Sequence, residues 1–191
     1  SFISLEEALE ILNDKIDNLD TEEVTLFNGL NKVLGKDVYA SINNPPFNKS
    51  AMDGYAVICE DAFINNRLEI IDKVYAGGVS NKIVTQNTAI KIMTGAPIPK
   101  GANAVIKQED VIIEDDNIII RNQVNENQNI CLVGEDISKG DLLVKANKRL
   151  NYSDIGIIAS SGISKINVFK KPKIAFFSTG DEVIDLDKSL V

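Results

Sequence analysis

The sequence predicts an α+β fold with helices near both ends of the chain and a β-rich middle. Apolar residues recur at helical spacing at the ends, whereas short apolar runs between polar turns fill the centre. An Asn-Asn-Pro-Pro connector at residues 43–46 separates the first helical region from the strands, because proline lacks a backbone donor and restricts the residue before it. We therefore predict helices at both ends of the chain around a small β-barrel-like middle, followed by the first strand of a truncated α/β domain.

Two helices are predicted before the connector. Ser4 and Glu7 form a capping-box pattern, and the apolar spacing that follows predicts an amphipathic helix over 5–17. A second apolar stripe predicts a helix over 26–34, with Gly35 at the position of a left-handed C-cap.

The middle of the chain has the composition of a small barrel or sandwich, because its strands are short and separated by turn residues. Residues 114–117 have a hairpin-turn composition, and the Asn-rich stretch 122–129 is expected to be a solvated loop. The candidate strands are 55–58, 68–75, 89–93, 104–107, 111–113 and 118–121.

Helical signals return at Asn151, which can cap a helix reaching Ser160, and 166–169 is a predicted strand. The apolar run 174–177 is typical of a strand in a buried parallel sheet, and a polar turn follows it. Because one strand cannot form a sheet, we expect the chain to continue beyond residue 191.

Composition narrows the function classes. With 20 basic and 28 acidic residues, the net charge of −8 disfavours a nucleic acid or an anionic membrane as the main partner. No run approaches the roughly 20 apolar residues of a membrane span, and no signal peptide is visible, so a cytoplasmic protein is expected. The chain has no His, and Cys59 and Cys131 are far apart, so any metal is expected to be a hard cation such as Mg²⁺ held by oxygen atoms.

Four loops combine carboxylates or hydroxyls with glycine or proline. Glycine lets a backbone approach a ligand and frees N–H groups for phosphate, and neighbouring carboxylates can hold a hard cation. Each loop alone is more typical of a plain turn or a solvated acidic segment than of a ligand site. The loops are 50–56, 93–99, 133–137 and 178–182.

Their combination and order resemble a known family. The runs 45–57 and 92–105, then Gln108-Glu109, 134–137 and 176–183, are similar to the signatures of molybdopterin molybdenumtransferases, which include the C-terminal part of gephyrin. The resemblance identifies the chain as an N-terminal portion of a family member. It implies insertion of molybdate into adenylylated molybdopterin with Mg²⁺-dependent release of AMP. It also implies a discontinuous N-terminal helical domain (1–44 and 142–171), an inserted small β-barrel-like domain (45–141) and a truncated α/β molybdopterin-binding domain (172–191). A homodimer and a molybdopterin adenylyltransferase as upstream partner are implied as well.

The resemblance also carries functional roles onto matching positions. Asp53, Thr94, Asp136 and Glu182 are the implied catalytic residues, and the three acidic ones are the implied Mg²⁺ ligands. The implied contacts to the cofactor substrate are Ser50, Gly95, Ser178, Thr179 and Gly180.

One loop departs from the family pattern. Where the family often has arginines before Gly-Glu-Asp, this chain has Cys131, Leu132 and Val133, which weakens an anion-binding role for that loop. Two alternatives stay open: a non-catalytic module for dimerisation and substrate shaping, and a paralogue that handles tungstate or acts as a scaffold. No position separates molybdate from tungstate use.

Overall fold

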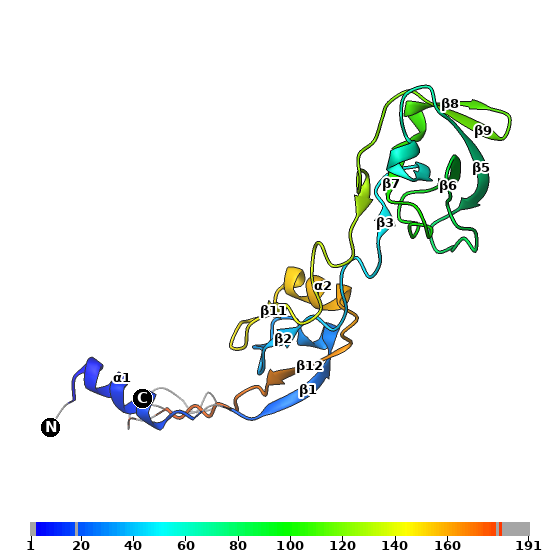
Figure 1. Ribbon diagram of the computed structural model, residues 1–191. Coiled ribbons are helices and arrows are strands. Elements are labelled where there is room, and N and C mark those ends of the chain that lie inside the picture. The colour runs from blue at the N-terminus through cyan, green and yellow to red at the C-terminus, as the bar shows by residue number, and fades with distance from the viewer. Residues whose placement is uncertain (1–2, 18, 179, 181–191) are drawn as a thin grey trace, which may run out of the picture.

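The computed structural model describes residues 3–17, 19–178 and 180, and this part of the chain is mostly strand with two α-helices. Figure 1 shows an extended arrangement: a β-rich unit at one end, a smaller mixed unit around α2 (Tyr152–Ser160), and α1 (Leu5–Lys15) at the other end. None of the described helices is long and apolar enough to cross a membrane.

The β-rich unit is a curled six-stranded sheet in the order β7-β4-β6-β5-β9-β8. Every neighbouring pair is antiparallel except β5 with β6. All six strands predicted in the middle of the chain are confirmed to within a residue at each end, as is the hairpin turn at 115–116. The strands are β4 (Gly54–Val57), β5 (Arg67–Val74), β6 (Thr88–Ile92), β7 (Ala104–Lys107), β8 (Val111–Glu114) and β9 (Asn117–Ile120).

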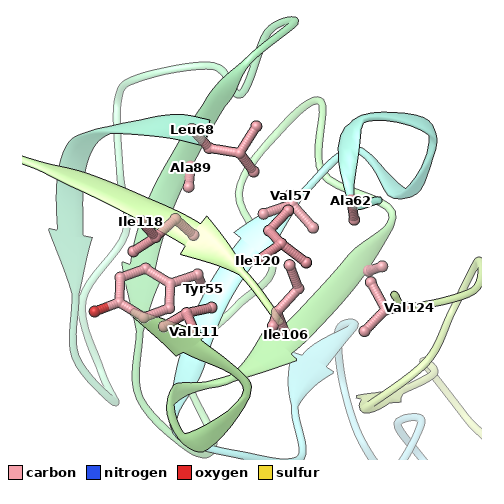
Figure 2. Packing of buried hydrophobic residues seen from close by; sticks show 11 residues of the cluster. Tyr55, Val57, Ala62, Leu68, Ala89, Ile106, Val111, Ile118, Ile120 and Val124 are labelled. Atoms are coloured by element: carbon pink, nitrogen blue, oxygen red, sulfur yellow. The ribbon is translucent and has the colours of Figure 1, made fainter. Parts of the chain in front are cut away.

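Alternating side chains of these strands bury two separate apolar clusters, one on each face of the sheet. The inner cluster includes Tyr55, Ile106 and Ile118, which lie close together in Figure 2. The outer cluster includes Ala56, which follows Tyr55 in sequence, and Ile90, which is the register partner of Ala56. This period of two is why short β-branched runs form strands here: each strand has one apolar set for each face.

Two chain passages join the sheet to the smaller unit. β3 (Lys49–Ser50) pairs antiparallel with β10 (Ile130–Cys131), and Asn44 forms a bridge to Ile137 further along. The Asn-rich segment before β10 is a loop, as predicted.

The smaller unit combines segments from both ends of the chain. β1 (Thr21–Thr25) pairs with β12 (Lys165–Phe169), and β2 (Val38–Tyr39) pairs with β11 (Leu142–Val144). The buried face of α2 packs on them in a third apolar cluster. The predicted helix after Asn151 and the predicted strand at 166–169 are therefore confirmed.

The second predicted helix is wrong. Residues 26–34 contain one 3₁₀ turn, η1 (Leu26–Gly29), and Asn31 then adopts a left-handed φ of 63°. Leu34 forms a bridge to Val168, and Gly35 N–H donates to the Asn167 carbonyl over 2.8 Å. The apolar side chains have a helical spacing, but backbone pairing with β12 satisfies this segment instead.

The strand predicted at 174–177 is also wrong. These residues have no regular secondary structure, and Phe176 is 90% exposed. A strand requires a hydrogen-bonding neighbour, and no described segment pairs with this one. The helix predicted at 5–17 is confirmed as α1 with its capping box, although none of its residues is buried. The domain boundaries stay predictions.

A buried carboxylate at the start of α2 leads to a first testable prediction. Asp154 has a side chain that is 8% exposed; it accepts the Asn151 N–H over 3.0 Å and the Lys148 ammonium over 2.6 Å. Burial alone would raise the pKa of Asp154, but the Lys148 ammonium and the Asn151 N–H outweigh it and lower that pKa.

We expect Asp154→Asn to reduce the free energy of unfolding by about 1–2 kcal/mol at pH 7. Because the folded-state pKa is lowered, the contribution is present above the ordinary pKa of about 4 and is lost as pH falls through the folded value. Urea unfolding of both proteins at pH 7 and at pH 3 measures the difference. A difference of equal size at both pH values would contradict this assignment.

Candidate functional site

Asp53 and Thr94, from two different predicted loops, are in direct contact. The Thr94 N–H donates to Asp53 Oδ1 over 2.7 Å, and the Thr94 hydroxyl donates to the same oxygen over 2.8 Å. Both side chains are exposed. The structure therefore brings together a carboxylate and a hydroxyl that are 41 positions apart in the chain.

Strand register explains why they meet. Gly54, the first residue of β4, is paired with Ile92, the last residue of β6. The residue before β4 and the residues after β6 therefore lie at the same end of the sheet. Gln108, just after β7, also reaches this end, since its N–H donates to the Asp53 carbonyl over 3.1 Å.

Ser50 and Gly95 hold the two loops in place. The Gly95 N–H donates to the Ser50 carbonyl over 2.8 Å, and Gly95 has a φ of 81°, where a side chain is disfavoured. Ser50 is 1% exposed, and its hydroxyl donates to the Met52 carbonyl over 2.6 Å. In this structure both residues order the backbone behind the site, and the Ser50 hydroxyl is already engaged within the protein.

The electrostatics of Asp53 suit a permanently charged carboxylate. The Thr94 N–H, followed by the Thr94 hydroxyl, lowers the pKa of Asp53, and burial opposes this only weakly. Both hydrogen bonds end on Oδ1, and no hydrogen bond or ion pair with the described residues uses Oδ2. Asp53 therefore presents one charged oxygen to the surface while Thr94 fixes its orientation.

We expect Thr94→Val to raise the pKa of Asp53 toward its ordinary value. The substitution removes the hydroxyl donor but keeps the backbone N–H, so the rise should be partial. A carboxyl-carbon NMR titration of Asp53 in both proteins measures the shift. An unchanged pKa would show that the hydroxyl contributes nothing to the charge state of Asp53.

Asp136 lies on a different segment, the passage that follows β10. Its N–H donates to the Asn44 carbonyl over 3.1 Å, and its side chain is exposed. Burial and then the Glu135 carboxylate raise the pKa of the nearby Cys131 thiol. This loop thus places a neutral thiol beside acidic side chains.

The remaining predicted residues are at the end of the chain. Ser178 and Gly180 belong to a segment without regular structure, and Gly180 has a φ of 133°. Thr179 and Glu182 lie outside the described residues.

The described part of the chain does not form a complete metal site. No group of three or more Cys, Asp or Glu side chains among the described residues is arranged to hold a metal ion. Asp53 fits Mg²⁺ as one oxygen ligand, directly or through water, and a six-coordinate ion would need further ligands.

Two surface hollows lie in the smaller unit, away from Asp53 and Thr94. One of about 410 Å³ is lined by residues that include Lys32, Phe169 and Lys170, and one of about 240 Å³ by residues that include Tyr39 and Lys165. Neither contains a predicted site residue. We place the candidate site at the sheet end because there the two longest motifs meet.

Sequence reasoning missed the lysines at this end of the sheet. Lys91 is the register partner of Tyr55, and Lys73 is the register partner of Lys91. For Lys91 the signal was a charged residue inside an otherwise apolar strand, whereas Lys73 lies in a strand with several charged residues and gives no such signal.

Comparisons with known proteins agree on one family. Residues 3–162 match the family described as MoeA N-terminal region (domain I and II). Molybdopterin molybdenumtransferases of Staphylococcus aureus (strain MSSA476) and Staphylococcus epidermidis (strain ATCC 12228) are each 36% identical over 193 residues, covering 98% of this chain and 46% of the relative.

Solved structures give the same result. Two crystal structures of the molybdopterin biosynthesis MoeA protein of Pyrococcus horikoshii are similar to this chain. One has a TM-score of 0.82 at 40% identity, covering 90% of this chain and 47% of its own. The other has a TM-score of 0.89 at 36% identity, and the match covers 100% of this chain and 50% of that structure's chain. The chain spans about half the length of the curated relatives it matches.

Proposed function

Because the chain belongs to the MoeA family, we propose that it is the N-terminal part of a molybdopterin molybdenumtransferase acting in molybdenum cofactor biosynthesis. The proposed reaction inserts molybdate into adenylylated molybdopterin and releases AMP in a Mg²⁺-dependent step. We further propose that the protein is a cytoplasmic homodimer that receives its substrate from a molybdopterin adenylyltransferase.

The contact between Asp53 and Thr94 is the observation that carries this proposal. Each residue comes from one of the two longest family-like motifs, and strand pairing brings both motifs to one sheet end. Their polar groups are exposed, so a ligand can reach them. The contact leaves an ionised carboxylate of Asp53 at the surface, where a cation can reach it.

The chain's own residues would act mainly by positioning and by charge. Thr94 holds Asp53 ionised through two hydrogen bonds to Oδ1, and Oδ2 would hold Mg²⁺ or a water molecule bound to it. Asp136 and Glu182 would supply further oxygen ligands from other segments. When bound, Mg²⁺ would screen the repulsion between molybdate and the phosphate-bearing pterin and polarise the phosphoanhydride.

AMP release tests the proposal. The natural protein carrying this sequence, at its full length, is incubated with adenylylated molybdopterin, with and without Mg²⁺ and molybdate. We expect AMP to appear only when both are present. If no AMP is released under any condition, the enzymatic proposal is wrong.

A second candidate is a non-catalytic module for dimerisation and substrate shaping. Oligomeric state and AMP release separate the two: a dimer that leaves adenylylated molybdopterin intact supports the module. Running the same assay with tungstate tests the remaining possibility of a tungstate-handling paralogue.

A further inference from the structure

Two lysines face each other at the same end of the sheet as Asp53 and Thr94. Lys73 of β5 and Lys91 of β6 are register partners in the parallel strand pair. Neither forms an ion pair with any described residue. Like charges at directly paired positions are unfavourable in a sheet, so a pair without a counter-charge needs an explanation.

A phenol lies beside the two ammonium groups. Tyr55 of β4 is the register partner of Lys91 on its other side, and the Lys91 ammonium lies 6.0 Å from the Tyr55 ring centroid. Figure 2 shows the ring inserted between apolar side chains such as Ile118 and Val111, with the hydroxyl oxygen pointing out of the cluster. Tyr55 is 1% exposed, so its ring fills the core, and its hydroxyl oxygen is turned away from the cluster.

The electrostatics of Tyr55 report the same proximity. Burial raises the pKa of Tyr55, and the Lys73 charge acts in the opposite direction. The Lys73 ammonium also lies 4.7 Å from the centroid of the Tyr75 ring. Both lysines are therefore held close to the surface by aromatic rings, which limits their freedom before any ligand arrives.

These groups adjoin the candidate site. Lys91 precedes Thr94 by three positions, and Tyr55 follows Asp53 by two. Because a chain advances at most about 3.3 Å per residue in a strand, the corresponding Cα atoms are separated by no more than roughly 7–10 Å. One extended anionic ligand can span this distance and touch both sets of residues.

We propose that Lys73, Lys91 and the Tyr55 hydroxyl form an oxyanion-binding rim that takes phosphate oxygens of a phosphorylated substrate. The proposal rests on the proposed function, which requires a phosphate-bearing pterin to approach Asp53. We call these three residues the lysine rim.

The charge of the whole protein supports an oxyanion as the ligand. A net charge of −8 repels an anionic substrate, so local cations are needed wherever such a substrate binds. Ammonium groups and a phenol are hydrogen-bond donors. Phosphate oxygens are mainly acceptors at neutral pH, so the two sets of groups are complementary. The Cys131 loop, with its acidic neighbours, supplies no such attraction.

Binding of a simple anion tests the lysine rim without any turnover. The chain is titrated with inorganic pyrophosphate while NMR follows the ε-methylene signals of its lysines. We expect saturable shifts of Lys73 and Lys91, with a dissociation constant on the order of 1 mM. We expect Lys73→Gln and Lys91→Gln each to weaken binding about tenfold, and Tyr55→Phe to weaken it by about threefold.

Two control variants separate a site from a general effect of charge. Lys145 is exposed and has no side-chain hydrogen bond or ion pair with the described residues, so Lys145→Gln should change binding by less than about twofold. Lys73→Arg keeps the charge and should retain binding. Backbone amide spectra of all variants establish that each is folded.

A parallel titration with molybdate distinguishes the source of the oxyanion. Tighter binding of pyrophosphate supports phosphate oxygens as the ligand, whereas tighter binding of molybdate assigns the rim to the metal oxyanion and overturns the phosphate proposal. Equal weakening by Lys145→Gln and Lys73→Gln, or no saturable shift, overturns the site. Pyrophosphate binding in a protein that releases no AMP would leave the rim standing and remove only the proposed enzymatic function.

Discussion

Replacing Gly54 by alanine is expected to destabilise the six-stranded sheet by more than about 3 kcal/mol. A Cβ atom built at Gly54 lies 1.9 Å from the Ile106 carbonyl oxygen and 2.9 Å from its carbonyl carbon. Gly54 is buried and is paired with Ile92 on one side and Lys107 on the other. Neither neighbouring backbone can move away without breaking its own ladder of hydrogen bonds.

Urea unfolding followed by circular dichroism measures the loss, and amide hydrogen exchange in β4 assigns it to the sheet. Gly156→Ala is the matched control, because Gly156 lies in α2 with no atom within 4 Å of an added Cβ. That change should stabilise the protein by about 0.5–1 kcal/mol. Unchanged stability of Gly54→Ala would show that β4 and β7 pack less closely than the structure indicates.

The close approach at Gly54 matters for the site as well as for stability. Asp53 directly precedes this glycine, so the spacing of β4 from β6 and β7 determines where the carboxylate lies. A side chain that displaced β4 would also displace Asp53 from Thr94, with which it forms two hydrogen bonds. The glycine of the Met-Asp-Gly-Tyr motif is therefore required because β4 packs too closely against β7 for a side chain, and not because of a turn.

The strands of the sheet could be predicted because each depends on local sequence. Runs such as 104–107 and 118–121 alternate between the two faces and end at polar turns, so their pattern needs no knowledge of their neighbours. Their order in the sheet could not be predicted in the same way. β5 and β6 are parallel, and a loop of 13 residues connects them. The alternation of apolar residues within each strand does not indicate which strands pair or in which direction.

The erroneous helix at 26–34 has a physical cause. Leu26 and Leu34 have helical spacing, and both are buried in the smaller unit. Pairing of the backbone with β12 satisfies its hydrogen bonds as well as a helix would, and this pairing joins residues more than 130 positions apart. Tertiary contacts therefore override a local preference that is weak for so short a segment.

For the site, the motifs identified the residues, and strand register determined which of them meet. Asp53 and Thr94 were singled out by family resemblance, but their contact depends on the pairing of Gly54 with Ile92. Lys73 and Lys91 belong to no motif and gain significance only as register partners. Asp136 was also singled out, by a shorter and less specific motif, and it lies on the passage beside Asn44, beyond the β3–β10 pair.

Asp53→Asn is expected to reduce the rate of AMP release by about 100-fold or more in the natural full-length protein. Asparagine keeps an oxygen that can accept both hydrogen bonds from Thr94, so the loops should keep their positions. The negative charge on the outward oxygen is lost, and with it the attraction for Mg²⁺. A higher Mg²⁺ concentration should recover part of the rate, which a purely structural defect would not allow.

Asp115→Asn provides the matched control for this loss of one negative charge. Asp115 lies in the β8–β9 hairpin turn with a φ of 51°, a conformation that asparagine adopts readily. Its rate should stay within about twofold of the unmodified protein, because screening by salt removes long-range effects of one surface charge. If Asp53→Asn and Asp115→Asn release AMP equally fast, the Asp53–Thr94 pair only orders two loops, and catalysis depends on other residues. A large loss of AMP release in Asp53→Asn alone would instead identify the sheet end as the part of this chain that acts on the substrate. Asparagine can keep both hydrogen bonds from Thr94, so such a loss would not come from displaced loops.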